Sequence, residues 1–146
     1  MKAPYLLFAG VLLLASCNAD SSTSGNEVSN ALTPSESGVS SKLQPISSQE
    51  TKALLAQQAD VVILDVRTPA EYEAGHLQGA RLMDIYAADF QERLQALDPT
   101  KTYLVYCAVG GRSREALQLM GQLGFQQVYD ASEGFSALKT AGVPVE

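Results

Sequence analysis

The residue with the clearest potential for chemistry is Cys107, which stands in the run YCAVGGRS. Gly110 and Gly111 allow backbone conformations that other residues rarely adopt, so successive amide N–H groups can face the sulfur as an anion-binding nest. Arg112 adds a cation, and a helix starting near Ser113 would direct its positive dipole end at the same point. Such surroundings lower the pKa of a thiol from about 8.5 to roughly 3.5–7.5, so the thiolate dominates at neutral pH. The pattern predicts that Cys107 is a nucleophile.

A lone cysteine also has a plain structural interpretation, as an inert small hydrophobe in a protein core. The convergence of two glycines, an arginine and a helix start on one thiol favours the reactive interpretation. We therefore predict Cys107 as the catalytic residue and the segment after it as the substrate-binding loop. That loop comprises Ala108, Val109, Gly110, Gly111, Arg112 and Ser113.

The elements that must position this loop follow from hydrophobic patterning. Residues 61–64 and 102–106 are largely apolar runs, typical of strands buried on both faces, and the second run ends at Cys107. Further strands are expected at 80–83 and 127–129, and helices at 49–58, 69–75, 89–97, 113–123 and 135–141. This alternation predicts an α/β fold with a mainly parallel sheet covered on both faces. Sites in such sheets form beyond the carboxyl ends of the strands, which is where Cys107 stands.

The first residues, MKAPYLLFAGVLLLASC, place Lys2 before an apolar run that closes on small residues and Cys17. This is the pattern of a bacterial export signal, and the run is shorter than the roughly 20 residues of a membrane-spanning helix. The end of the run, LASC, resembles the lipobox of bacterial lipoproteins, which implies that Cys17 carries acyl chains. We predict a periplasmic or otherwise extracytoplasmic protein held on a membrane by this lipid anchor alone. The residue after the cysteine is Asn18 and not Asp, which by resemblance to the sorting rule of Gram-negative lipoproteins implies the outer membrane if the host is Gram-negative.

Composition divides the chain into a signal peptide at 1–17, a disordered tether rich in Ser and Thr at 18–45, and a globular domain at 46–146. The net charge is −6 and the pI is about 4.7, so the chain lacks the excess of basic residues that binding to nucleic acid or to an anionic membrane surface requires. Once Cys17 is lipidated, Cys107 is the only free thiol, so no internal disulfide can form. One histidine and one free cysteine predict no metal site. We expect a monomer.

Two separated motifs carry a resemblance to a known family. The first is C-x-x-G-x-R-S at 107–113, and the second is LDVRTPAEY at 64–72, followed by Gly75-His76 and Gly79-Ala80. Together they resemble the single-domain rhodanese family over nearly the whole globular part. The resemblance implies a three-layer fold with a five-stranded, mainly parallel sheet flanked by helices on both faces. It also implies a sulfurtransferase without a cofactor, in which the cysteine takes sulfane sulfur as a persulfide and passes it to cyanide or to a thiol, including a protein thiol.

The same resemblance places Asp65 and Arg67 beside the loop as supporting residues. A capping and salt-bridge cluster and a direct role in substrate binding are equally good interpretations of this pair. His76, the only histidine, invites a Cys-His dyad, but its match to a structural family position favours a role in stabilising the fold. The family's tryptophan near the last helix is missing, and we expect Phe135 to replace its packing.

Loop length distinguishes two chemistries. Cdc25-type phosphatases resemble this fold but have one more residue between cysteine and arginine, whereas this loop has four, 108–111. The tighter ring suits a single sulfur atom, so sulfur transfer is favoured over phosphoryl transfer. Many thiosulfate-using relatives carry a basic residue where this chain has Ala108, and Ala108 with Val109 makes an apolar rim that suits a persulfide donor. A non-catalytic binding module stays open as the alternative function.

Overall fold

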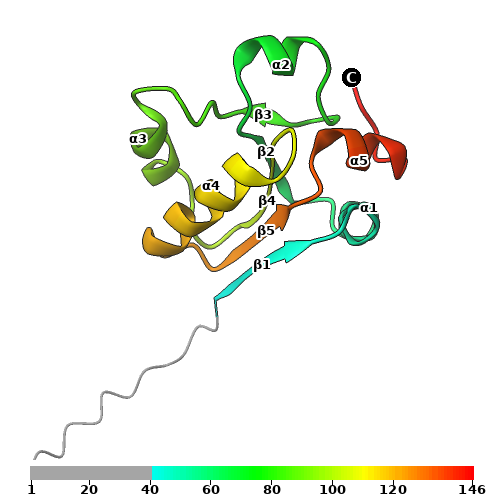
Figure 1. The fold of residues 1–146 in the computed structure, drawn as a ribbon. Helices are drawn as coiled ribbons and strands as arrows, with labels where there is room; N and C mark the ends of the chain where they lie inside the picture. Colours follow the sequence, from blue (N-terminus) through cyan, green and yellow to red (C-terminus); the bar gives the residue numbers. More distant parts are fainter. Residues whose placement is uncertain (1–40) are drawn as a thin grey trace, which may run out of the picture. The chain divides into compact units, whose positions relative to one another are not determined.

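The computed structural model describes residues 41–146. The predicted signal peptide, the lipidated Cys17 and the tether as far as residue 40 lie outside the described residues. Figure 1 shows the elements in chain order: β1 (Lys42–Ile46), α1 (Ser48–Gln57), β2 (Val62–Asp65), α2 (Pro69–Glu73), β3 (Arg81–Leu82), α3 (Phe90–Gln95), β4 (Thr102–Tyr106), α4 (Gly111–Gln122), β5 (Gln127–Ala131) and α5 (Phe135–Thr140).

The five strands form one sheet in the order β1-β5-β4-β2-β3, and every neighbouring pair is parallel. Side chains alternate between the two faces of each strand, so each face has its own core. One core lies under α3 and α4 and includes Val105 and Cys107; the other lies under α1 and α5 and includes Leu104 and Tyr106. This confirms the predicted α/β architecture and places β4, which leads into Cys107, in the centre of the sheet.

Two helix starts follow directly from capping chemistry. Ser47 caps α1 and Thr68 caps α2, each accepting from the backbone N–H three residues on. In both cases the glutamate at that position reaches back to the capping residue, which completes a capping box. Pro69 occupies the first turn of α2, as its fixed φ favours.

The start of the domain differs from the prediction, which ran the tether to residue 45. β1 begins at Lys42 and pairs along its length with β5, from Lys42 opposite Gln127 to Ile46 opposite Ala131. The pattern was missed because KLQPI holds only two large apolar residues and a proline. Proline is tolerated here because β1 is an edge strand and pairs on one side only.

The start of α4 also differs from the prediction. The helix begins at Gly111, two residues before the expected Ser113, and Gly110 occupies its N-cap position. Arg112 is therefore a residue of the first helical turn rather than of the loop. The loop proper is reduced to the residues between β4 and Gly111, which brings the helix N-terminus closer to Cys107.

Candidate active site

Cys107 follows the last residue of β4, and its side chain is almost completely buried, with 1 % exposed. The Gly110 amide donates to Sγ at 3.1 Å. Burial opposes ionisation of the thiol, but hydrogen bonds from Ser113 and from the Val109 and Gly110 amides outweigh it and lower the pKa of Cys107. One amide of the predicted nest, that of Gly110, thus donates to the sulfur, and the polar groups around the thiol favour the thiolate.

Gly110 fixes the shape of this nest. Its φ of 88° lies in the left-handed region, and an added Cβ would collide with the Ser132 carbonyl group. Gly134, also at positive φ, leaves no room for a Cβ against the Ala108 carbonyl. The Phe135 amide donates to the Cys107 carbonyl at 2.8 Å. The segment after β5 thus clamps the loop, and Gly134 is a residue that the loop motif alone did not reveal.

Gly111 contributes less than predicted. It is the first residue of α4, its φ lies outside the left-handed region, and a Cβ there would meet no atom within 4 Å. Of the two glycines assigned to the nest, only Gly110 is required by backbone geometry.

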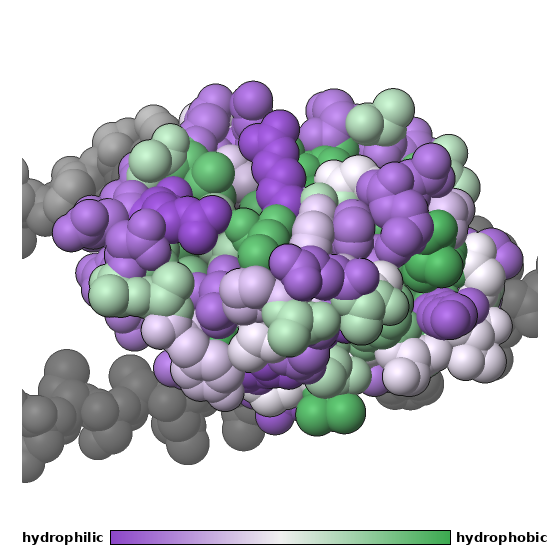
Figure 2. Space-filling model, turned by 90° about the horizontal axis from the view of Figure 1, so that it is seen from above, coloured by the Kyte–Doolittle hydropathy of each residue, from purple (hydrophilic) through white to green (hydrophobic). Residues whose placement is uncertain are grey.

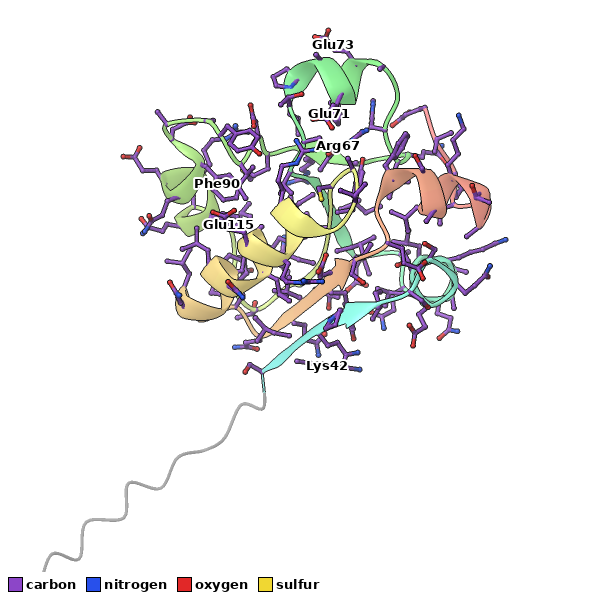
Figure 3. All side chains as sticks on the ribbon, viewed as in Figure 1. Lys42, Arg67, Glu71, Glu73, Phe90 and Glu115 are labelled. Carbon is purple, nitrogen blue, oxygen red and sulfur yellow. The ribbon has the colours of Figure 1, made fainter. Side chains whose placement is uncertain are left out.

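Arg112 has a different partner from the one predicted. Its guanidinium donates two hydrogen bonds to the Glu71 carboxylate, both at 2.7 Å. This contact lowers the pKa of Glu71 to about 2 and raises that of Arg112. Figure 3 shows Glu71 on α2, above Arg67 and near the start of α4. Arg112 is close enough for its charge to interact with Cys107, but hydrogen bonds from Ser113, Val109 and Gly110 carry the lowering of the thiol pKa.

Asp65 and Arg67 form a buried ion pair beneath the site. Arg67 donates to both carboxylate oxygens of Asp65, and the Tyr106 hydroxyl donates to the same carboxylate at 2.6 Å. The guanidinium also lies 4.2 Å from the centroid of the Phe135 ring. The ion pair therefore holds two neighbours of Cys107 in place: Tyr106, which precedes it in the chain, and Phe135, whose amide donates to the Cys107 carbonyl. This is the geometry of a salt-bridge cluster that supports the loop.

His76 makes its contacts elsewhere. Its ring stacks on Tyr72 with centroids 3.7 Å apart, Nδ1 lies 3.1 Å from the Tyr72 carbonyl oxygen, and Nε2 lies 3.5 Å from the Glu146 carboxylate. Its backbone pairs with that of Glu146. These contacts hold the C-terminal segment against α2 and match a role in the fold.

The mouth of the site carries exposed apolar side chains. Val109 is 83 % exposed and Tyr86 is 71 % exposed, and the Arg112 guanidinium lies 5.9 Å from the Tyr86 ring centroid. Ala108 is half-buried. On the side of the domain seen in Figure 2, small hydrophobic areas are separated by hydrophilic residues. Val109 and Tyr86 therefore give the site an exposed apolar rim.

Two buried polar side chains next to the loop were not singled out together by the sequence. Ser113 and Asp130 are both fully buried, and the Ser113 hydroxyl and both Asp130 carboxyl oxygens lack a well-formed hydrogen bond. Asp130 gave no sequence signal, because its strand was predicted to end at residue 129. Glu71 appeared only inside the LDVRTPAEY motif, with no role of its own.

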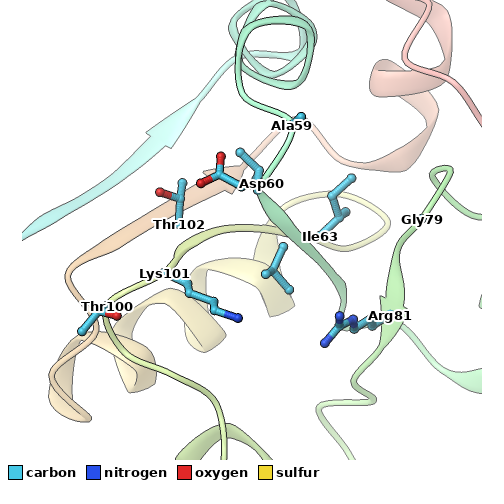
Figure 4. Close-up of a pocket in the computed structure, with 10 residues that line it drawn as sticks. Ala59, Asp60, Ile63, Gly79, Arg81, Thr100, Lys101 and Thr102 are labelled. Carbon is cyan, nitrogen blue, oxygen red and sulfur yellow. The ribbon is translucent and has the colours of Figure 1, made fainter.

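A cavity of about 480 Å³ lies away from this loop. Figure 4 shows its lining at the start of β2 and β4, with Arg81 and Lys101 beside it. These are the ends of the strands opposite to Cys107. Within residues 41–146 there is no cluster of three or more potential metal ligands. No helix in the same range is long and apolar enough to cross a membrane.

Comparisons with known proteins agree with this geometry. The family described as "Rhodanese-like domain" matches residues 47–141. The thiosulfate sulfurtransferase GlpE of Pseudomonas entomophila is 36% identical over 96 residues, covering 65% of this chain and 84% of that protein. A sulfurtransferase of Allochromatium vinosum is 28% identical, covering 68% and 92%. The solved structure of the rhodanese-like domain of the Alr3790 protein from Anabaena superposes with a TM-score of 0.63 at 30% identity, covering 70% of this chain and 77% of that one.

Proposed function

The chain belongs to the rhodanese-like domain family, and we propose that this rhodanese-type sulfurtransferase carries sulfane sulfur on Cys107 as a persulfide. The Cys107 thiolate attacks the outer sulfur of a donor such as thiosulfate or a persulfide. A new S–S bond to Cys107 forms, the donor's S–S bond breaks, and sulfite or a thiolate leaves with the electron pair. An acceptor thiolate or cyanide then attacks the outer sulfur of the persulfide and releases the Cys107 thiolate, so no cofactor is consumed.

The observation that carries the proposal is the hydrogen bond of 3.1 Å from the Gly110 amide to Sγ. The Val109 and Ser113 amides also contribute to the lowered pKa of the thiol. A thiol with a lowered pKa is ionised at lower pH and is ready to attack without a general base. The amides also suit the persulfide, because its terminal sulfur carries the negative charge after transfer.

Charge at the mouth indicates which donor suits the site. Glu71 neutralises Arg112 through two hydrogen bonds, and Ala108 and Val109 add no charge. A thiosulfate dianion therefore meets less positive charge than a free arginine would give. We propose a persulfide of a small thiol or of a protein as the preferred donor, and a thiol as the acceptor.

Intact mass spectrometry after incubation with thiosulfate, glutathione persulfide or 3-mercaptopyruvate tests the transfer step. We expect an adduct of about 32 Da, one sulfur atom, that cyanide removes and that Cys107→Ser abolishes. The absence of an adduct from every donor, or an equal adduct in Cys107→Ser, would reject the proposal. An unperturbed thiol pKa near 8.5 would instead favour a non-catalytic binding module.

We further propose that the protein acts at a membrane on the extracytoplasmic side, tethered through lipidated Cys17. The support is the export-signal pattern of the first residues and the LASC sequence. Labelling of cells with a radioactive fatty acid tests it: the protein should take up label, and Cys17→Ala should abolish that uptake. Equal labelling of the two, or no labelling of either, would contradict the anchor.

A further inference from the structure

Asp130 is a buried carboxyl that the transfer steps above do not use. Its side chain is fully buried, and neither carboxyl oxygen has a well-formed hydrogen bond. None of the ion pairs among residues 41–146 involves Asp130. A carboxylate without partners is costly to bury, so its protonated form is favoured. In keeping with this, burial raises the pKa of Asp130, opposed only by Ser113 and by the exposed Arg114.

The sheet register places Asp130 on the same face as the nucleophile. Asp130 of β5 pairs with Val105 of β4, two residues before Cys107. Side chains alternate along a strand, so Asp130 shares the face of Val128, which packs in one core with Val105 and Cys107. That face is covered by α4, and Ser113 is the first fully buried side chain of this helix. Within residues 41–146, Arg114 is the only charged group that shifts the pKa of Asp130.

Ser113 connects the two groups. It is buried on the face of α4 that covers Asp130 and Cys107, and its hydroxyl, like both Asp130 carboxyl oxygens, makes no well-formed hydrogen bond, so it is free to pair with either group. In keeping with this placement, Ser113 contributes to the lowered pKa of Cys107 and opposes the rise at Asp130. A serine hydroxyl has one proton to donate and two lone pairs to accept with. If Asp130 were ionised, it would draw that proton away from the sulfur. If Asp130 is protonated, its O–H donates to Ser113 Oγ and the Ser113 proton points at the sulfur.

We propose that Asp130 is a positioning residue for the nucleophile: its protonated carboxyl donates to the Ser113 hydroxyl, which in turn donates to the thiolate or persulfide of Cys107. No proton leaves Asp130 during the reaction, because the carboxyl acts only by orienting Ser113. The inference rests on the proposed function in taking Cys107 as the reacting group.

The pH dependence of the rate of alkylation by iodoacetamide gives the thiol pKa in each variant. Asp130→Asn is the matched control, because its amide N–H can donate to Ser113 as the protonated carboxyl does. We expect Asp130→Asn to keep the wild-type thiol pKa. Asp130→Ala removes the donor and should raise the thiol pKa by about 0.5, which slows alkylation about threefold below the pKa. Ser113→Ala should raise it at least as much, and adding Asp130→Ala to Ser113→Ala should change nothing further.

Other outcomes overturn the inference. A lower thiol pKa in both Asp130→Asn and Asp130→Ala would mean that Asp130 is an anion, and an unchanged pKa in Asp130→Ala would mean that it does not act on the sulfur. Infrared difference spectroscopy between wild type and Asp130→Asn gives a second measurement that does not depend on Asp130→Ala folding. A protonated-carboxyl band present in the wild type at neutral pH and lost in Asp130→Asn supports the inference, and its absence overturns it.

These measurements remain separate from the test of sulfur transfer. Alkylation reports the thiol alone and needs no sulfur donor, whereas the mass adduct reports the persulfide. Failure of every donor with the expected alkylation pattern would reject the transfer and leave the positioning role standing. Adduct formation without any effect of the Asp130 substitutions on the thiol pKa would support sulfur transfer and reject the positioning role.

Discussion

Gly110→Ala, compared with Gly111→Ala, is the sharpest test of how the loop is built. At Gly110 a new Cβ would lie 2.9 Å from the Ser132 carbonyl carbon and closer still to its oxygen, and the backbone has a φ of 88°. At Gly111 the same atom would meet nothing within 4 Å. The two substitutions add the same methyl group to adjacent residues, so any difference between them reports the loop geometry.

The magnitude follows from two terms. A left-handed φ costs a residue with a Cβ about 1–2 kcal/mol. Overpacking against the backbone of Ser132 adds about 1–3 kcal/mol, because backbone cannot swing aside as a flexible side chain does. The sum, roughly 2–5 kcal/mol, corresponds to a fall in Tm of roughly 10–30 °C for a domain of this size. Gly111→Ala should instead be neutral or stabilise by up to about 1 kcal/mol, since alanine favours the helix.

Thermal unfolding followed by circular dichroism measures the loss of stability, and the pH dependence of alkylation measures the pKa of the Cys107 thiol. Where Gly110→Ala still folds, its loop must move, so the Gly110 amide leaves Sγ and the thiol pKa rises. A Tm for Gly110→Ala within about 2 °C of that of Gly111→Ala, a difference of less than about 1 kcal/mol, would refute the interlocking of the loop with Ser132.

Three further substitutions test neighbouring contacts. The pKa of Glu71, about 2 against an ordinary 4.5, lies below its unfolded value, so its pair with Arg112 stabilises the fold above pH 4.5 and loses that contribution as the pH falls towards 2. Because the pair is partly exposed, we expect it to contribute about 1 kcal/mol to the free energy of unfolding, and we expect Glu71→Gln to lack this pH-dependent contribution. If the free energy of unfolding depended on pH equally in the wild type and in Glu71→Gln, this prediction would be contradicted. Tyr106→Phe removes the hydroxyl that donates to Asp65 at 2.6 Å and should cost about 1–3 kcal/mol in urea unfolding, a loss below about 0.5 kcal/mol being the contrary result. Ala108→Arg should raise kcat/KM for thiosulfate about tenfold and leave a neutral persulfide donor unchanged, whereas an equal gain for both donors would show that charge at the rim is not selective.

Most of the fold could be predicted because its signals are local. Apolar runs marked β2 and β4, and the capping boxes at Ser47 and Thr68 are formed by residues only three apart in the sequence. β1 could not be predicted in the same way, because KLQPI becomes a strand only by pairing with β5, which lies far along the chain. Tertiary pairing of this kind overrides weak local propensity.

The candidate site likewise combines features with local sequence signals and features that depend on distant parts of the chain. The thiol, the left-handed Gly110 and the approach of the helix to the sulfur follow from neighbouring residues in the sequence. The partners of Arg112 and Ser113 do not, because Glu71 comes from α2 and Asp130 from β5. The sequence around Cys107 therefore indicated the groups next to the thiol but not how the surrounding charges are distributed.

The burial of Cys107 has a consequence for the lifetime of its persulfide. With only 1 % of the residue exposed, the sulfur offers little surface to molecules in solution. Persulfides and thiolates are lost to oxidants and to mixed disulfides, reactions that need approach to the sulfur. Burial in this loop should therefore slow such side reactions and lengthen the life of the persulfide proposed for Cys107.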